Sequence, residues 1–261
     1  MSARPRVVLV VGATGSVGRL VVEESIRRGY ATRALVRDAE KARRLPSGAD
    51  IVVSDVTRPD TLPVAVAGID AVVFTHGSDG AGKVGAENVD YSGVRNVLTA
   101  LDAQPARIAL MTSIGVTNRT SSYTRATEAH DWKRRSERLV RASGRPYTIV
   151  RPGWFDYNAP DQLRLVLLQG DKRQAGDPSD GVIARRQIAQ VIVSSLGSEA
   201  ATRKTFELVA EPGPAPQDLD ALFARLQPDP PGSLDGVYDV ENMPLTDEPR
   251  RVRQDLETLS A

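Results

Sequence analysis

The stretch RVVLVVGATGSVGRLVVEESIRRG, residues 6–29, decides the fold. Residues 7–11 are an unbroken run of valine and leucine, which is typical of a buried strand. A segment with helical spacing of apolar residues follows and ends at Gly29, a common helix stop. Between strand and helix lies GATGSVG, with glycines at every third position. This strand–loop–helix order predicts a dinucleotide-binding loop rather than a merely structural turn.

Each glycine of this loop meets a different steric requirement. Gly12 permits a sharp turn, Gly15 lets the backbone approach a diphosphate, and Gly18 lets the helix pack against the strand. The free N–H groups and the dipole at the helix N-terminus favour an anion there. The other loop residues expected to contact the cofactor are Thr14, Ser16 and Val17.

Short β-branched runs alternate with helical segments over the first 153 residues. Strands are expected at 31–37, 49–55, 70–76, 106–113 and 147–153, and helices at 39–45, 59–68, 86–103 and 131–144. Continuous apolar strands separated by helices predict a parallel sheet covered on both faces. With right-handed crossovers, the expected fold class is α/β, a doubly wound parallel sheet.

The pattern changes after Gly153. Residues 154–226 are expected to form a small α+β substrate-binding lobe that is interleaved with the first domain. Its expected strands are 161–171, antiparallel or a hairpin, and 203–210; its helices are 184–198 and 217–226. Residues 227–261 are predicted as a Pro/Gly-rich linker and polar tail. Such a tail would lie on the surface or exchange with a partner copy in a homodimer.

Composition excludes several classes of function. With 34 basic and 33 acidic residues, the chain is not expected to bind nucleic acid or an anionic membrane. No apolar run approaches the roughly 18 residues of a membrane span, and MSARPR is too short and polar for a signal peptide. Absence of cysteine, with only two histidines, argues against metal sites. A cytoplasmic protein acting on a small molecule is expected.

The second strand ends in LVRD, where a dinucleotide site distinguishes its cofactors. Arg37 would bind a 2′-phosphate through charge-assisted hydrogen bonds, which favours NADP(H). Asp38 is the alternative, since an acid at this position binds the ribose hydroxyl of NAD(H). Lys41, Arg43 and Arg44 are expected to form a solvated helix face.

Further cofactor contacts are expected where the third and fourth strands end. Asp55 would accept a hydrogen bond from the adenine amino group above Val56, or else cap the following turn. Thr75, His76 and Gly77 stand where a parallel sheet places its ligand crevice, although His76 is also consistent with a place beside the pocket.

Seven segments together resemble the atypical short-chain dehydrogenase/reductases. They are GATGSVG, LVR, SDV, VDYSGVRNVL, TSIGV, RASGRPYTIVRPGWF and KTFELVA, within residues 6–226. The chain is similar to the branch with NmrA-like regulators and biliverdin-reductase-B-like enzymes. The resemblance implies a Rossmann domain that binds NADP(H), and a C-terminal lobe that forms the substrate pocket.

The resemblance also implies two catalytic residues and lacks a third. Ser113 matches the serine after the fifth strand, and Lys133 matches the lysine of a Tyr-x-x-x-Lys helix. The tyrosine would fall at residue 129, where this chain has Ala129. Lys133 would still hold the nicotinamide ribose; otherwise it is one of several solvated cations in KRRSER, residues 133–138.

Several groups are candidates for the missing proton donor. Tyr123 lies in a loop before the helix, and His130 titrates near neutral pH. Solvent is the third source, for acceptors that need little acid catalysis. Asp131 is expected to cap the helix instead.

The strand ending RPGWF is expected at the nicotinamide end. Pro152 and Gly153 would bring backbone to the carboxamide. Trp154 and Phe155 would wall the substrate pocket or seal the lobe against the sheet. The side chains with an equal claim to the crevice or to the helix surface are Asp90, Tyr91 and Asn96.

The sequence therefore predicts an NADP(H)-dependent oxidoreductase acting on a carbonyl, quinone or conjugated compound. Two alternatives stay open: a catalytically silent NADP(H)-binding redox sensor, and an NAD(P)-dependent epimerase or isomerase.

Overall fold

A ten-stranded, mostly parallel sheet forms the centre of the computed structural model, which describes residues 6–78 and 80–260. The order is β3–β2–β1–β4–β5–β6–β10–β9–β7, and β8 pairs antiparallel with β10. The first six strands are β1 (Val7–Val11), β2 (Ala31–Val36), β3 (Ala49–Val53), β4 (Ala71–Phe74), β5 (Arg107–Met111) and β6 (Tyr147–Pro152). The others are β7 (Trp154–Phe155), β8 (Arg164–Leu168), β9 (Val182–Ile183) and β10 (Lys204–Glu211). The doubly wound sheet is confirmed, and its order reverses beside β1.

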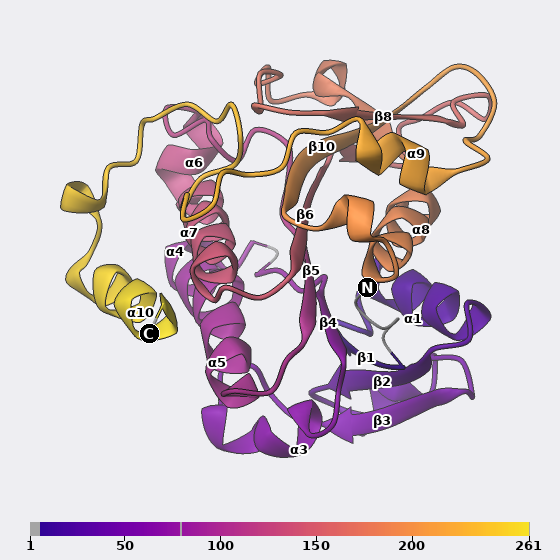
Figure 1. Ribbon diagram of the computed structural model, residues 1–261, viewed down its shortest axis with the longest axis vertical. Helices are drawn as coiled ribbons and strands as arrows, with labels where there is room; N and C mark the ends of the chain where they lie inside the picture. The colour runs from indigo at the N-terminus through magenta and orange to yellow at the C-terminus, as the bar shows by residue number, and fades with distance from the viewer. Residues whose placement is uncertain (1–5, 79, 261) are drawn as a thin grey trace.

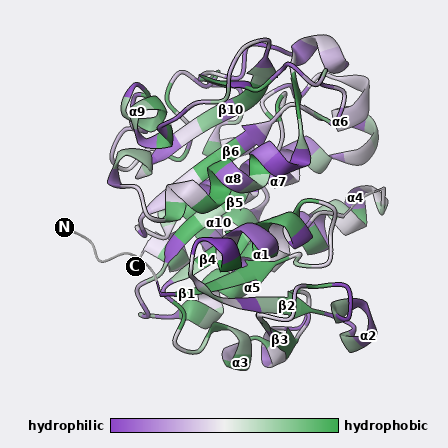
Figure 2. Ribbon diagram, turned by 90° about the vertical axis from the view of Figure 1, so that its right-hand side faces the viewer, coloured by the Kyte–Doolittle hydropathy of each residue, from purple (hydrophilic) through white to green (hydrophobic). Residues whose placement is uncertain are grey.

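Helices cover both faces of this sheet (Figure 1). One face packs against α1 (Gly18–Arg27) and α8 (Arg185–Leu196), and the other against α3 (Pro63–Val66), α5 (Ser92–Leu101) and α7 (Ala129–Ala142). The strands between them are the most hydrophobic part of the chain (Figure 2). Short helices complete the fold: α2 (Ala39–Ala42), α4 (Gly82–Gly85), α6 (Ser122–Thr127) and α9 (Leu219–Ala224).

Two expected helices differ in detail. The helix expected at 59–68 is divided into a 3-10 turn, Pro59–Thr61, and α3, since Pro63 has no N–H to continue the first turn. The helix expected at 86–103 begins as a π-helical segment, Ala86–Tyr91, which runs directly into α5. Such wide turns recur at functional sites.

The sheet also incorporates much of the chain after Gly153. β10 pairs parallel with β6 and thereby extends the first domain's sheet. On the covering face, α8 packs with α1 in one apolar cluster. β10 and α8 therefore belong to the same sheet and the same apolar cluster as the elements before Gly153.

The C-terminal segment, residues 227–260, lies against α7 and ends in α10 (Arg250–Ser260), which packs outside α5 and α7 (Figure 1). Its acidic side chains pair with buried arginines. Asp235 bonds Arg134 and Arg138 at 3.1 and 2.7 Å, and Asp229 bonds Arg141 at 3.2 Å. The arginines of KRRSER are therefore buried, because distant carboxylates neutralise them.

One more arginine extends these contacts into the sheet. Arg151 of β6 is fully buried and pairs with Glu137, Glu207 and Asp239 at 2.7–3.2 Å. We refer to the following residues as the arginine network: Arg134, Arg138, Arg141, Arg151, Glu137, Glu207, Asp229, Asp235 and Asp239.

No helix among the described residues is long and apolar enough to cross a membrane. The prediction about MSARPR falls almost wholly outside the described residues, which begin at Arg6.

Candidate functional site

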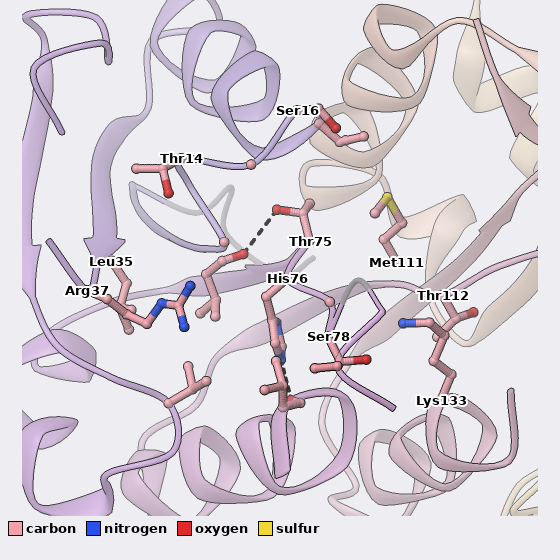
Figure 3. Close-up of a pocket in the computed structure, with 18 of the residues that line it drawn as sticks. Thr14, Ser16, Leu35, Arg37, Thr75, His76, Ser78, Met111, Thr112 and Lys133 are labelled. Carbon is pink, nitrogen blue, oxygen red and sulfur yellow. Dashed lines mark hydrogen bonds between the residues drawn. The ribbon is translucent and has the colours of Figure 1, made fainter. Parts of the chain in front are cut away.

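A cleft of about 540 Å³ lies at the carboxyl ends of the first five strands (Figure 3). Parallel sheets place ligands at this edge, beside the point where the strand order reverses. The predicted residues that line it are Gly12, Thr14, Gly15, Ser16, Val17, Arg37, Asp55, Val56, Thr75, His76, Gly77, Ser113, Lys133 and Phe155.

The glycine loop has a shape that other residues would not allow. Gly12 has φ +85°, and a Cβ there would lie 2.6 Å from the His76 nitrogen. A Cβ on Gly18 would lie 2.0 Å from the Gly12 oxygen, so Gly18 packs beneath the loop rather than lining the cleft. The Thr75 hydroxyl donates to the Val11 oxygen at 3.0 Å and ties β4 to the start of the loop. These contacts keep the loop close to β4 and to the start of α1.

Arg37 and Asp38, the two residues predicted to decide between NADP(H) and NAD(H), follow β2, and Asp55 follows β3. Arg37 is exposed and lines the cleft. Asp38 accepts a hydrogen bond from the Glu40 N–H at 2.9 Å and so caps α2. Asp55 lines the cleft, yet its Oδ1 also accepts from the Thr57 N–H and hydroxyl at 2.9 and 2.8 Å. The adenine and capping interpretations of Asp55 are therefore compatible.

His76 lines the middle of the cleft with a defined tautomer. Its Nε2 lies 3.0 Å from the Val89 carbonyl oxygen, which only accepts, so the ring proton is on Nε2. The buried Nδ1 has no hydrogen-bond partner among the described residues. Burial lowers the pKa of His76 to about 4, which keeps the ring neutral near pH 7. His76 is therefore neutral with an unused acceptor at Nδ1, and it is a poor source of protons.

Lys133 occupies the other end of the cleft from Arg37 (Figure 3). Its Nζ donates to Asp90 Oδ1 at 2.6 Å, and the Ser78 hydroxyl donates to Asp90 Oδ2 at 2.6 Å. Asp90 is buried in the π-helical segment, and α7 brings Lys133 against it. An ammonium has three N–H donors, so this pairing leaves others for a ligand.

Ser113 follows β5 and presents an unused hydroxyl. Its Oγ is buried in the cleft wall without a hydrogen-bond partner among the described residues. The loop behind it is fixed by Asp171, which accepts from the N–H groups of Gly115 and Thr117 at 2.7 Å. Beside it, the Thr112 hydroxyl donates to Glu137 at 2.7 Å, so the arginine network reaches the cleft wall.

The residues considered as replacement proton donors lie elsewhere. Ala129 is buried one helical turn before Lys133. Tyr123 is half-exposed, and its ring packs edge-on against His130 at 5.0 Å. His130 contacts the Thr124 hydroxyl at 3.1 Å, and burial lowers its pKa to about 4. Neither Tyr123 nor His130 is among the described residues lining the cleft.

Three other expectations differ from the structure. Asp131 pairs with Arg119 at 3.3 Å and does not cap α7. Pro152 and Gly153 are absent from the described lining, and the Gly153 N–H donates to the Leu208 oxygen within the sheet. Phe155 lines the cleft, whereas Trp154 packs against Tyr157 on the exposed surface.

Tyr91 and Asn96, expected with Asp90 either in the crevice or on the helix surface, make structural contacts instead. The Tyr91 hydroxyl donates to Asp255 of α10 at 2.8 Å, and Asn96 donates to the Val56 oxygen at 2.8 Å. Several further residues line the cleft that were not predicted from the sequence: Val11, Leu35, Thr57, Ser78, Ala81, Val89, Met111 and Thr112. Most of them stand within two residues of a predicted one, so a strand-end rule with a wider window would have found them.

Comparison with known proteins agrees with this geometry. The model of a family described as NAD(P)H-binding matches residues 12–199. Sanguinarine reductase of Eschscholzia californica is 28% identical over 268 residues, covering 86% of this chain and 97% of that protein. Photosystem II assembly factor Ycf39 of Cyanophora paradoxa is 31% identical over 222 residues, covering 84% and 68%.

A solved structure resembles this fold over most of the chain. A candidate NAD-dependent epimerase/dehydratase from Bacillus halodurans is 26% identical, with a TM-score of 0.67, covering 85% of this chain and 100% of that one. The residues of the cleft fit such a dinucleotide. The glycine loop leaves no room for a Cβ, and two lining residues, Ser113 and His76, each have a buried polar atom, Oγ and Nδ1, without a partner among the described residues.

Proposed function

The chain belongs to the NAD(P)H-binding oxidoreductase family, and on that premise we propose that it is an NADP(H)-dependent reductase of a small conjugated compound. The observation that carries this proposal is the composition of the cleft's nicotinamide end. It has a cation and a free hydroxyl, Lys133 and Ser113, but no tyrosine among its described lining residues. Such a site suits an acceptor that takes a hydride and draws its proton from water.

Each end of the cleft has a separate task in this reaction. NADPH, when bound, supplies the hydride. Arg37 holds the 2′-phosphate at one end, and Lys133 donates to the nicotinamide ribose at the other. Ser113 donates its unused hydroxyl to the acceptor atom on which negative charge develops. Quinones and related compounds delocalise that charge, so a protonated side chain is unnecessary.

Turnover tests this proposal. We expect stopped-flow loss of NADPH absorbance with quinones, flavins or sanguinarine, and none with an unconjugated ketone. Ser113→Ala should lower kcat/KM by roughly tenfold to a hundredfold while the NADPH Kd stays unchanged, because the hydroxyl acts on the acceptor. Tight NADPH binding without turnover of any compound would refute the reductase proposal.

The preference for NADP(H) is tested separately. Arg37→Gln should raise the NADPH Kd by about tenfold to a hundredfold, since a charged hydrogen-bond donor to the 2′-phosphate is lost. The NADH Kd should not change. Arg43→Gln is the matched control, because Arg43 is exposed on the next helix and pairs with Glu40 at 3.0 Å. Equal losses for NADPH and NADH in Arg37→Gln would contradict the proposed 2′-phosphate contact.

A second candidate follows from Ala129. A buried alanine where the family's proton donor is expected also fits a redox sensor, and a relative named as an assembly factor is 31% identical over 222 residues. A sensor would bind a protein partner with different affinities in its NADP+ and NADPH forms. Pull-downs with each form distinguish it from the reductase.

An epimerase or isomerase remains the third candidate, supported by the likeness to the Bacillus halodurans protein. Such an enzyme would retain its cofactor through purification. Release of NAD+ rather than NADP+ from the denatured protein would favour this candidate over the reductase.

A further inference from the structure

The middle of the cleft has few positive charges for a diphosphate. The glycine loop offers backbone N–H groups and the hydroxyls of Thr14 and Ser16. The cations among the described lining residues are Arg37 and Lys133, which stand at opposite ends (Figure 3). Lys133 is already paired with Asp90 at 2.6 Å. A diphosphate over the loop would therefore meet no lining cation of its own.

A cation from the C-terminal part of the chain reaches this place. Arg185 is the first residue of α8, and its Nε donates to the Ser16 hydroxyl at 3.1 Å. Its guanidinium carbon stands 5.1 Å from the centre of the Phe155 ring. Ser16 and Phe155 both line the cleft, so the guanidinium lies between the phosphate loop and the cleft wall.

The backbone and a carboxylate hold Arg185 in this position. Asp156 accepts a hydrogen bond from the Arg185 N–H at 3.0 Å and forms an ion pair with its guanidinium. Asp156 has φ +59°, a left-handed conformation that aims it at α8. The Arg185 side chain is 31% exposed, so one edge stays accessible to a ligand. Its neighbour Arg186 points elsewhere and pairs with Glu23 of α1 at 3.1 Å.

We propose that Arg185 binds the diphosphate of the cofactor and clamps it onto the glycine loop. A planar guanidinium suits phosphate oxygens, and stacking on Phe155 orients it before the ligand arrives. The Ser16 hydroxyl exchanges its contact with Arg185 for the ligand. The part of the chain after Gly153 thereby contributes to cofactor affinity. This inference rests on the proposed NADP(H) site, and not on catalysis there.

Two fragments of the cofactor separate this clamp from the 2′-phosphate site. ADP-ribose contains the diphosphate and lacks the 2′-phosphate, and 2′-AMP has the reverse. Calorimetric titration of Arg185→Gln should show a Kd for ADP-ribose raised about tenfold or more, with the 2′-AMP Kd unchanged. Arg37→Gln should give the opposite pattern. Arg186→Gln is the matched control and should bind both fragments like the wild type.

Two more variants separate the effect of the Arg185 charge from that of its packing on Phe155. Arg185→Lys should keep part of the ADP-ribose affinity, and Phe155→Leu should lose less than Arg185→Gln does. An Arg185→Gln variant with the wild-type Kd for ADP-ribose overturns the clamp, whatever the 2′-AMP titration shows. A wild-type protein that does not bind 2′-AMP would overturn the NADP(H) preference. The ADP-ribose titration would still test the clamp.

Discussion

The cofactor cleft and the C-terminal segment both depend on charged and polar side chains. They differ in how far apart along the chain the residues that come together lie. The glycine loop is complete within residues 12–18, and the ends of β2 to β5 each add two to four neighbouring residues to the cleft. The segment 227–260 instead brings Asp235 to Arg134, which stands 101 residues earlier. Local order defines the first region, whereas tertiary pairing defines the second.

The two regions also differ in what their charges do. Arg37 in the cleft is exposed and available to a ligand. Arg134 and Arg151 have no exposed side-chain surface and are satisfied by the protein itself. Buried ion pairs of this kind seldom add net stability over an apolar core, but breaking one is costly because the remaining charge is stranded. The comparison therefore predicts strong effects of single changes in the network.

The largest expected effect is that of Arg151→Met. The substitution leaves Glu137, Glu207 and Asp239 buried without their shared cation. We expect the free energy of unfolding to fall by about 3–5 kcal/mol, measured by urea denaturation. Arg43→Met, which breaks an exposed pair, should change it by less than about 1 kcal/mol. An Arg151→Met protein as stable as the wild type would show that the network is no tighter than a surface pair.

The pH dependence of stability gives the next effect. Burial raises the pKa of Glu207 to about 7, although Arg151 opposes the shift. Between the ordinary pKa of 4.5 and about 7, the Glu207 carboxyl is protonated in the folded state and ionised in the unfolded state. This protonation stabilises the folded state, and the stabilisation falls as pH rises through that range. Burial of His76 and His130 lowers each pKa to about 4, which gives the opposite slope between there and 6.5.

Glu207→Gln isolates the carboxyl from the histidines. The wild type should lose about 2 kcal/mol more than the variant between pH 5 and pH 8, measured as the difference in urea unfolding. Glu211→Gln, on the same strand but at the surface with Arg164, should keep the wild-type slope. Parallel profiles for Glu207→Gln and the wild type would contradict the raised pKa.

Prediction from the sequence succeeded where the signal was local. Strand periodicity and helix stops located the Rossmann core, and the strand-end rule placed Arg37, Asp55 and Thr75 on the cleft. Gly153 lies outside the described lining of the cleft, and its N–H donates to the Leu208 oxygen of β10, far along the chain. No residue near Gly153 in the sequence predicts that hydrogen bond.

The C-terminal segment shows the same limit for charges. Proline and glycine in QPDPPGSLDG indicated a linker, and charged residues are ordinarily solvated. Burial of Arg134 depends on Asp235 and Asn242, whose pairing is decided by the tertiary fold. One local feature of the sequence is consistent with this burial. The apolar residues Trp132, Leu139 and Val140 cover only part of the buried face of α7, so arginines cover the rest.

The smallest effect concerns the cleft, where the local signal was strongest. A Cβ on Gly18 would stand 2.0 Å from the Gly12 oxygen, and backbone must move to relieve the contact. We expect Gly18→Ala to raise the NADPH Kd by about tenfold, because the strain displaces the loop that receives the phosphates. Gly48→Ala is the matched control, since its Cβ meets only Ile26 at 3.4 Å. An unchanged Kd in Gly18→Ala would mean that the loop adapts freely, and that its glycine spacing is less decisive for binding than its place in the fold.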